Sequence, residues 1–370
     1  MQAESLNKLD RVYAEIENRL STGKWAVGDR IPTEAQLAAE FGCSMGTVSK
    51  AIARFTHAHA GVLERRTRGG TRVMRDIREG ASGANSLDLD ACAMVFPGEP
   101  HEGIWAVVRG FQKAAQAAGR RTVMLTSGPD VRKEAEIIGR LSEFDVKGAV
   151  VYPVMPEPRD QMVFAQMAKA CRFPVVFADL NIPGANCPAV IADGFHAGYT
   201  ATRHLIDGGL KKIGFLANHA WATSMRDRYL GYRRALEEAG LPEVQDWVRL
   251  DPVMHPDFAN PMAEPYRIAR DYLRGSKTVE GVVCANDFLA IGCVGVANEL
   301  GLTVPDDLRV VGIDNLAASA STVPGLTTYA IPNERIGERA FTVLNDLIQG
   351  RHPPVQETLM RGELVVRRSG

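Results

Sequence analysis

The feature that most constrains this chain is an alternation of short apolar runs with longer amphipathic stretches, extending from about residue 91 to 313. Strands separated by crossover helices form parallel sheets that are covered by helices on both faces. We expect helices over about 103–118, 132–143 and 225–239, and one that ends near residue 300. The predicted strands are ACAMVF (91–96), TVMLT (122–126), GAVVY (148–152), PVVFA (174–178), IGFLA (213–217), GVVCA (281–285) and RVVGI (309–313). One compact sheet is not the simplest arrangement for so many strands, so we expect two doubly wound α/β lobes.

Length and composition exclude several protein classes. With 370 residues, of which 45% are hydrophobic, the chain can bury more than one core, so two or three domains are expected. It has no run of about 18 apolar residues, and its first segment, MQAESLNKLDRVYAEI, is charged throughout. We therefore expect a cytoplasmic protein that neither enters a membrane nor is exported. Its six cysteines are scattered, which favours buried reduced thiols over disulfides or a metal site.

The first 75 residues carry signals for three helices and a hairpin. Apolar spacing predicts an amphipathic helix over about 6–21. Thr33 stands three positions before Gln36, a capping-box pattern that marks the start of a second helix. A third helix is predicted from a cap at Ser44 to about Phe55, followed by two short strands, VLERR and TRVM, around a TRGG turn. A helix, a helix-turn-helix and a wing are the parts of a winged-helix domain.

The net charge of −1 conceals an asymmetry between the two parts of the chain. Residues 1–78 hold 13 Lys and Arg against 9 Asp and Glu, a net +4, and the remainder holds 30 against 35, a net −5. An arginine cluster near the wing is usually a solvated surface, but beside a helix-turn-helix it has the sign that phosphate requires. Its members are Arg65, Arg66, Arg68, Arg72, Arg75 and Arg78.

The segments GDRIPTEAQLAAEFGCSMGTVSKAI and GVLERRTRGGTRV closely resemble GntR-type bacterial regulators, over about residues 6–75. The resemblance implies that 44–50 enters the DNA major groove and that the wing turn approaches the minor groove. In that family, arginines often stand at three positions held here by Ala35, Met45 and Ser49. Because one arginine on guanine contributes about 1–3 kcal/mol of discrimination, we expect a different operator sequence.

The candidate DNA contacts divide into base readers and phosphate contacts. Thr47, Ser49 and Lys50 are the candidate readers, and four arginines are candidate phosphate contacts. A helical hairpin that binds no DNA remains the alternative. The full candidate set is Thr33, Ser44, Thr47, Ser49, Lys50, Arg54, Arg65, Arg66, Arg68 and Thr71.

Polar residues directly follow three of the predicted strands of the large domain. Asp179 follows PVVFA, Asn286 and Asp287 follow GVVCA, and Asp314 follows RVVGI. Ligands of open parallel sheets bind at the carboxyl ends of the strands. Each of these residues has an alternative role as a cap for the next helix, but their recurrence favours a shared cleft.

From about Ala91 to Ser369 the chain resembles the lactose/galactose repressor family. The resemblance rests on ATRHLIDGGLKKIGFL, RYLGYRRALEEAGL, CANDFLAIGCVGVANELGLTVPDDLRVVGIDN, VPGLTTYAIPNERIGERAFTVLNDLIQG and ELVVRRS. It implies a domain like a periplasmic sugar-binding protein, with two lobes that the chain crosses three times. The combination with a GntR-type head is similar to arabinose-repressor-type regulators. We expect a winged helix at 1–75, a linker at 76–89 and a two-lobed domain at 90–370, with lobe one at about 90–190 plus 331–358 and lobe two at about 191–330 plus 359–370.

The same resemblance assigns effector-binding roles to particular residues. Arg228 is implied as a clamp on ring or hydroxyl oxygens, and Asn286, Asp314 and Asp179 as hydroxyl-binding groups. An aromatic wall is expected from Trp105, Phe177 or Trp221, in that order. PGEPHEGIW (97–105) replaces the family's usual Asn-Pro-Phe run, so His101 and Glu102 either touch the ligand or only cap the following helix.

Together these features predict a DNA-binding transcriptional regulator, expected to be a repressor, that responds to a small carbohydrate. A homodimer on a pseudo-palindromic operator is expected, with no cofactor and no metal. No G-x-S-x-G, P-loop, HExxH or G-x-G-x-x-G motif supports an enzyme. The rival hypotheses are a solute-binding protein for sugar uptake and a GntR regulator fused to a pyridoxal-phosphate domain. The effector, the operator, the target genes and the direction of the ligand's effect stay open.

Overall fold

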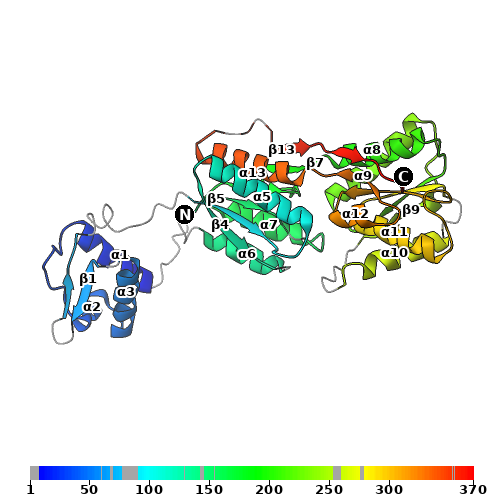
Figure 1. The fold of residues 1–370 in the computed structure, drawn as a ribbon. Helices are drawn as coiled ribbons and strands as arrows, with labels where there is room; N and C mark the ends of the chain where they lie inside the picture. Colours follow the sequence, from blue (N-terminus) through cyan, green and yellow to red (C-terminus); the bar gives the residue numbers. More distant parts are fainter. Residues whose placement is uncertain are drawn as a thin grey trace. The chain divides into compact units, whose positions relative to one another are not determined.

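The computed structural model divides into two compact units, Met1–Asp88 and Leu89–Gly370, which are described separately (Figure 1). The described residues are 8–59, 61–66, 70–76, 91–128, 130–141, 146–153, 155–252, 260–275, 279–351, 353 and 355–370. Arg68, the Arg66 side chain and the predicted linker beyond Asp76 lie outside this description.

The first unit contains the helices and the hairpin that the sequence predicted. Its elements are α1 (Lys8–Ser21), α2 (Glu34–Phe41), α3 (Met45–Ala58), β1 (Leu63–Arg66) and β2 (Gly70–Val73). The two strands are antiparallel, and Arg30 forms an isolated bridge with Arg72 beside them. The fold is therefore a winged helix-turn-helix, as expected.

Local hydrogen bonds define where the two middle helices begin and end. The Thr33 hydroxyl accepts the N–H of Gln36 at 3.3 Å, and the Gln36 side chain accepts the N–H of Thr33 at 2.9 Å, completing the predicted capping box. Gly42 ends α2 in the left-handed conformation, at φ 62°. Ser44 caps α3 by accepting the N–H of Thr47 at 3.2 Å.

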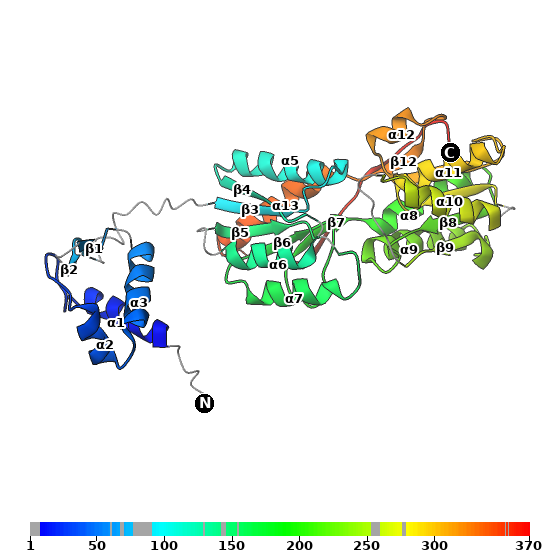
Figure 2. The same ribbon diagram turned by 90° about the horizontal axis from the view of Figure 1, so that it is seen from below.

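The second unit is built on two six-stranded sheets, one in each lobe (Figures 1 and 2). Every described strand pair is parallel except β12 with β14. The first sheet has the order β13 (Glu357–Met360), β7 (Ala189–Ala192), β6 (Val175–Ala178), β5 (Val146–Val151), β3 (Ala91–Phe96) and β4 (Arg121–Thr126). The second has the order β14 (Glu363–Val365), β12 (Thr327–Ala330), β11 (Arg309–Asp314), β10 (Gly281–Cys284), β8 (Ile213–Ala217) and β9 (Val248–Leu250). All seven predicted apolar runs form strands.

Helices cover both faces of each sheet, as expected for doubly wound lobes. In Figure 2 one face of the first sheet carries α5 (Glu102–Ala117) and α13 (Asn333–Ile348), and the other carries α6 (Val131–Arg140) and α7 (Asp160–Ala170). The second sheet has its faces covered by α8 (Gly194–Asp207) with α9 (Thr223–Glu238), and by α10 (Ala263–Gly275) with α11 (Asp287–Glu299). Two short helices, η2 (Gln245–Trp247) and α12 (Ala317–Ser321), complete the second lobe. No helix in the described parts of the chain is long and apolar enough to cross a membrane.

Three crossings of the chain join the lobes, and side chains connect them to one another. The Tyr329 hydroxyl at the second crossing accepts the N–H of Gly362 at 2.8 Å and lies 2.8 Å from Nδ1 of His196, near the first crossing. Asp193 accepts a hydrogen bond from Arg361 at 2.9 Å, which links the first crossing to the third. The first sheet extends through Ala192 and through residue 360, two residues past the ends expected for lobe one.

Helix pairs in both lobes are packed backbone against backbone at glycines. A Cβ added to Gly337 of α13 would lie 1.9 Å from the carbonyl oxygen of Val107 in α5. In lobe two, a Cβ on Gly198 of α8 would lie 1.9 Å from the carbonyl oxygen of Arg228 in α9. A side chain at either glycine forces the helices apart. The second contact fixes the position of the Arg228 backbone.

We expect Gly337→Ala to destabilise the second unit by about 1–3 kcal/mol, because its methyl group has no space between α13 and α5. Gly139→Ala is the matched control, since Gly139 is a helical glycine of the same lobe with no atom within 4 Å of the added Cβ. The control should be neutral or gain about 0.4–1 kcal/mol. Urea unfolding of both variants measures the difference. Equal midpoints for both variants would contradict the close packing.

Candidate functional site

Asp179 and Asp314 stand at the carboxyl ends of strands in the two sheets, and both have unusual backbone conformations. Asp179 follows β6 with φ 72°, and Asp314 ends β11 with φ 134°. Positive φ is uncommon for residues other than glycine and tends to occur at ligand sites. Tyr152, directly after β5, donates its hydroxyl to Oδ2 of Asp179 at 2.8 Å. The sequence reading missed Tyr152, although it also follows a strand.

Arg228 extends from α9 to the end of the second sheet. Its side chain is only 6% exposed and its guanidinium lies 3.3 Å from Oδ1 of Asp314. It also donates to the backbone carbonyl oxygen of Ala285, at the end of β10. Its Nε is buried and has no hydrogen-bond partner among the described residues. The structure thus brings together two residues, Arg228 and Asp314, that the sequence placed in one site.

Asn286 serves both as a helix cap and as part of a polar pair. Its side-chain oxygen accepts the N–H of Leu289 at 2.9 Å, as the capping alternative predicted. Its amide nitrogen donates to Oδ1 of Asn218 at 2.9 Å. Asn218 follows β8 and is 4% exposed. The sequence reading missed Asn218, whose only signal was its place after an apolar run.

Asp287, which also follows β10, has a structural role. Its buried carboxylate accepts hydrogen bonds from the Ser319 hydroxyl at 2.6 Å, the Thr328 hydroxyl at 2.5 Å and the N–H of Leu316 at 2.9 Å. These contacts hold the segment after Asp314 against the second sheet. Burial raises the pKa of Asp287, and these hydrogen bonds partly oppose the rise.

The two aspartates and their partners share one electrostatic environment. Burial raises the pKa of Asp314 from 3.8 to about 7; Arg228 opposes this rise, and Asp287 and Asp179 add to it. The pKa of Tyr152 is raised well above 10, chiefly by burial and also by Asp179 and Asp314. Burial is the main cause of both rises, and Arg228 opposes them only in part.

His101 and Glu102, at the start of α5, contact the second lobe. The His101 ring lies 6.0 Å from the ring of Phe288, and its Nδ1 is buried without a hydrogen-bond partner among the described residues. Its side chain forms no cap on α5. Burial lowers its pKa, which Asp179 and Glu102 act to raise. Glu102 accepts the N–H of Ala317 at 2.7 Å, across the lobes.

The three candidates for an aromatic wall have different environments. Phe177 is fully buried and packs against Phe164 inside the first lobe, so its assignment to the wall was wrong. A strand covered on both faces buries the side chains of both faces. Trp105 is 40% exposed and packs its edge against Phe96. Trp221 has a buried Nε1 without a hydrogen-bond partner among the described residues.

Trp221 and its neighbour His219 also join the lobes. Trp221 packs against the hydrophobic cluster of lobe one, and the His219 ring lies perpendicular to it at 4.7 Å. Nε2 of His219 is 2.9 Å from the carbonyl oxygen of Met155, in lobe one. Burial lowers the pKa of His219. No motif or spacing in the sequence pointed to His219.

A cavity of about 320 Å³ opens between α5, the end of β11 and the second crossing. Glu102 and Asp314 are both on its wall, so it adjoins the polar groups described above. The other lining residues that carry polar side chains are Arg109, Asn315, Asn333, Glu334 and Arg335.

In the first unit, two of the arginines predicted to contact phosphate are paired within the unit. Arg54 donates to Asp10 at 2.7 Å and stacks over Tyr13 at 4.9 Å, and Arg65 lies 2.7 Å from Glu34. Asp10 and Glu34 are distant in the sequence from Arg54 and Arg65. The sequence therefore could not show that these two arginines are paired inside the unit.

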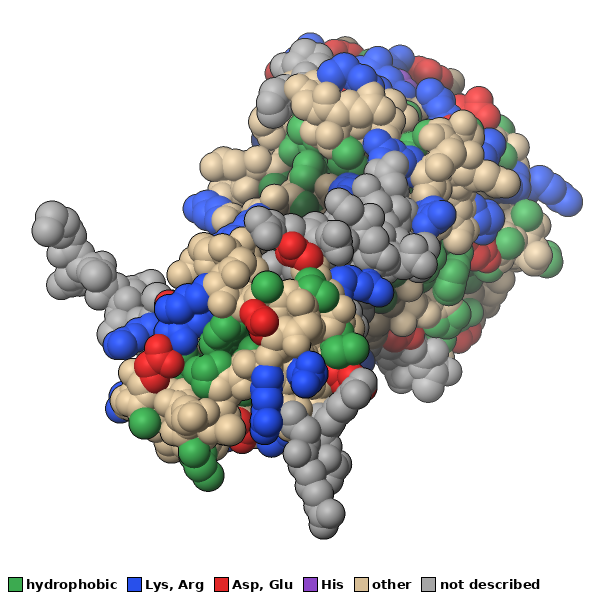
Figure 3. Space-filling view, turned by 90° about the vertical axis from the view of Figure 1, so that its left-hand side faces the viewer, with side chains coloured by type: hydrophobic (Ala, Val, Ile, Leu, Met, Phe, Trp, Pro, Cys, Tyr) green, Lys and Arg blue, Asp and Glu red, His purple; other side chains and the backbone are tan. Residues whose placement is uncertain are grey.

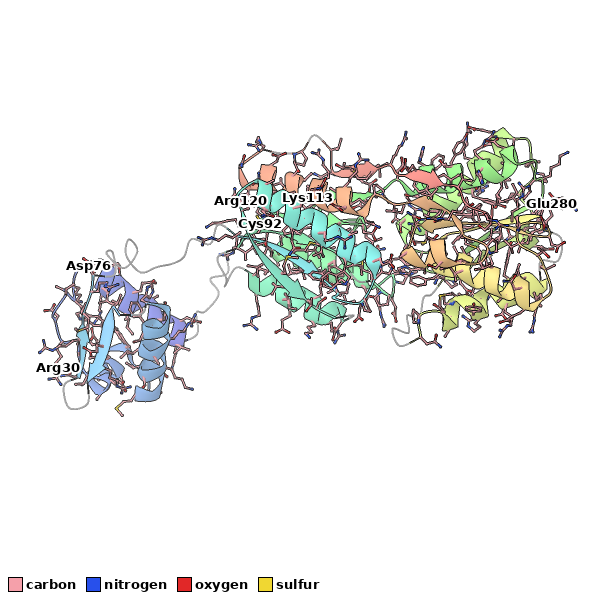
Figure 4. The ribbon with its side chains drawn as sticks, in the orientation of Figure 1. Arg30, Asp76, Cys92, Lys113, Arg120 and Glu280 are labelled. Carbon is pink, nitrogen blue, oxygen red and sulfur yellow. The ribbon has the colours of Figure 1, made fainter. Side chains whose placement is uncertain are left out.

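The other candidate DNA contacts differ in exposure. Thr33 and Ser44 are exposed caps, Lys50 is exposed, and Thr47, Ser49 and Thr71 are half-buried. Figure 3 presents a face of this unit on which hydrophobic side chains lie among Lys and Arg side chains. The exposed side chain of Arg30, labelled in Figure 4, was not among the predicted contacts. It lies against Gly70 at the start of β2, where a Cβ would be only 2.4 Å from its Nε.

Comparison with known proteins identifies both units. Residues 8–73 match the gntR family of bacterial regulatory proteins, and residues 202–370 match the periplasmic binding protein-like domain. The chain therefore combines a DNA-binding region of the GntR type with a periplasmic-binding-protein-like region. This confirms the two resemblances read from the sequence.

Relatives of this regulator are transcriptional repressors. The HTH-type transcriptional repressor PurR of Photobacterium profundum is 27% identical over 263 residues, which are 71% of this chain and 76% of the relative. The transcription regulator GntR from Chromobacterium violaceum is 26% identical, with a TM-score of 0.61 over 75% of this chain and 98% of that one. A CelR–cellobiose complex is 24% identical, with a TM-score of 0.66 over 92% of this chain and 100% of that one. These findings confirm the prediction of a DNA-binding transcriptional regulator.

The raised pKa of Asp314 predicts how stability depends on pH. A carboxyl whose folded pKa is raised from 3.8 to about 7 favours folding while it is protonated, and that contribution is lost as the pH rises through 7. We therefore expect Asp314→Asn, which stays neutral, to be more stable than wild type at pH 8 and nearly equal to it at pH 4. Urea unfolding of the ligand-free regulator at the two pH values is the measurement. A less stable Asn variant at pH 8 would show that Arg228 holds the carboxylate more strongly than burial disfavours it.

Proposed function

We propose that this regulator is a repressor whose affinity for operator DNA is controlled by a small carbohydrate bound between the lobes of its second unit. The main support is the placement of two polar pairs at the strand ends of the two sheets. Tyr152 pairs with Asp179, Arg228 pairs with Asp314, and the two aspartates interact electrostatically. A forked donor beside paired acceptors is suited to vicinal hydroxyl groups. The resemblance to a CelR–cellobiose complex supports the same class of ligand.

Unpaired polar atoms around this site support a ligand that accepts hydrogen bonds. Nε of Arg228 and Nε1 of Trp221 are donors without partners among the described residues, and Nδ1 of His101 is likewise unpaired. An unmet buried polar group costs about 1–3 kcal/mol, and a hydroxyl or ring oxygen offsets that cost. The carboxylate oxygens of Asp179 and Asp314 accept hydrogen bonds from the hydroxyl groups of the ligand. Hydrogen bonds alone are then enough to discriminate between sugars, and no chemical reaction is needed.

Ligand binding acts on DNA through the geometry of a dimer. Two copies place two winged helices on half-sites about 10 base pairs, or a multiple, apart. A ligand shifts DNA affinity only by its differential affinity for two arrangements of the lobes. The contacts of Glu102 with Ala317 and of His219 with Met155 cross between the lobes, so their strength differs between those arrangements. We infer that the regulator acts in the cytoplasm, as a homodimer.

A screen of mono- and disaccharides tests the effector. A sugar that binds the folded protein should raise its melting temperature, and the rise should grow with the logarithm of the sugar concentration above the Kd. A gel-shift assay with DNA from upstream of the neighbouring genes then measures operator binding with and without that sugar. Absence of specific binding at low salt overturns the regulator. Specific binding that no sugar alters overturns only the carbohydrate control.

We expect Arg228→Ala to weaken the binding of the sugar about 10–100-fold, because a hydrogen bond to a charged group contributes about 1.5–3 kcal/mol. Operator binding without sugar should be retained, which also reports correct folding. Arg226→Ala is the matched control, since Arg226 is an arginine of the same helix whose side chain is 62% exposed. Titration of the gel shift with sugar measures both variants. An unchanged response in Arg228→Ala removes this residue from the site.

A further inference from the structure

Helix α3 presents an apolar side chain to solvent in its first turn. Met45, the first residue of the helix, is 56% exposed and is not part of the core of the first unit. The core face of α3 is made by other residues, of which Val48 and Phe55 are fully buried. Single exposed apolar side chains are common on protein surfaces, so exposure alone does not distinguish Met45, but its position does. It is the first residue of the second helix of the helix-turn-helix, and in such domains the N-terminal residues of this helix contact base edges in the major groove.

Polar groups near Met45 are mostly engaged inside the domain. The Ser44 hydroxyl lies 2.9 Å from the Thr47 hydroxyl and also caps α3, so each of these two groups has a partner. Arg54 is paired with Asp10. Among the described side chains on the outer face of α3, Lys50 is exposed and has no such pair in the described structure.

The remaining outward positions of α3 are small. Gly46 and Ala53 are exposed, Ser49 is half-buried, and the helix contains no acidic residue. Small side chains let a helix approach base edges closely, and the absence of carboxylates removes repulsion from phosphate. The surface around Met45 is therefore suited to close apolar contact and offers few donors for reading guanine.

The apolar feature of a base pair in the major groove is the C5-methyl group of thymine. We propose that Met45 is a specificity-determining residue that packs its thioether on the C5-methyl group of one thymine in each operator half-site. An unbranched, polarisable side chain adapts to such a contact without exact geometry. This inference rests on the DNA-binding function of the first unit and names the base that its recognition helix reads.

Replacing thymine by deoxyuridine tests the proposal, because it removes only the methyl group. An operator is first selected from random unmethylated DNA with the full-length protein, and each thymine is then replaced singly. Burial of one methyl group corresponds to about a fourfold change in affinity, so one thymine per half-site should lose about fourfold on replacement. Thymines elsewhere should change less than twofold. If no thymine shows this loss, the proposal is overturned.

Variants assign the effect to Met45. Met45→Ala should bind the thymine and uracil operators equally, while Met45→Leu should keep most of the difference. Met74→Ala is the matched control, since Met74 is 45% exposed in the same unit and follows β2 at the end opposite the wing turn; it should keep the full difference. A penalty for uracil that survives in Met45→Ala overturns the assignment.

Two further arms separate the remaining outcomes. A cytosine placed at the sensitive position should bind weakly and recover affinity on C5-methylation, because 5-methylcytosine presents the same methyl group. If methylated cytosine binds better than thymine there, the base assignment to thymine is wrong. If selection yields no preferred sequence at all, the regulator function has failed, which is distinct from a selected operator that ignores the methyl group.

Discussion

The burial of Arg228 is the constraint on which the proposed effector site depends. Its backbone lies against Gly198, where no larger residue fits, so α8 fixes the point from which the side chain extends. From there the guanidinium contacts both Ala285 and Asp314, at the ends of two adjacent strands. A buried cation needs close partners, and among the described residues Asp314 forms an ion pair with Arg228 at 3.3 Å. Burial raises the pKa of Asp314, and Arg228 opposes that rise only in part. In the proposed function, a ligand rich in hydroxyl groups provides a hydrogen-bond partner for the unpaired Nε of Arg228 without adding charge.

The crossings between the lobes give this site a path to the rest of the molecule. Tyr329 connects all three crossings through His196 and Gly362, so a change in one crossing affects the others. These side chains hold the backbone of the crossings in place. The lobes also contact each other elsewhere, for example where His219 meets the carbonyl oxygen of Met155. Closure of the lobes therefore has defined contacts to make and to break, as a two-state element requires.

In the DNA-binding unit, arginines stabilise the fold at the expense of contacts with phosphate. Arg19, Arg54 and Arg65 each have a carboxylate partner inside the unit. Arg19 also lies over the rings of Trp25 and Phe41, so part of the basic character of this unit serves its own packing. The count of 13 Lys and Arg in residues 1–78 thus overstates the number of cations that are free to contact phosphate.

The sequence by itself determined the strands, the helix caps and the two-domain plan, because periodicity and capping depend on residues a few positions apart. It also placed Asp179, Asn286 and Asp314 at the carboxyl ends of parallel strands, which is where open sheets bind their ligands. Only the tertiary structure decided which partners these residues take. Tyr152 contacts Asp179, Asn218 contacts Asn286, Phe177 packs against Phe164, and Arg54 pairs with Asp10. Each of these contacts joins residues that are 13 to 68 positions apart in the sequence. Such long-range contacts leave no local pattern in the chain.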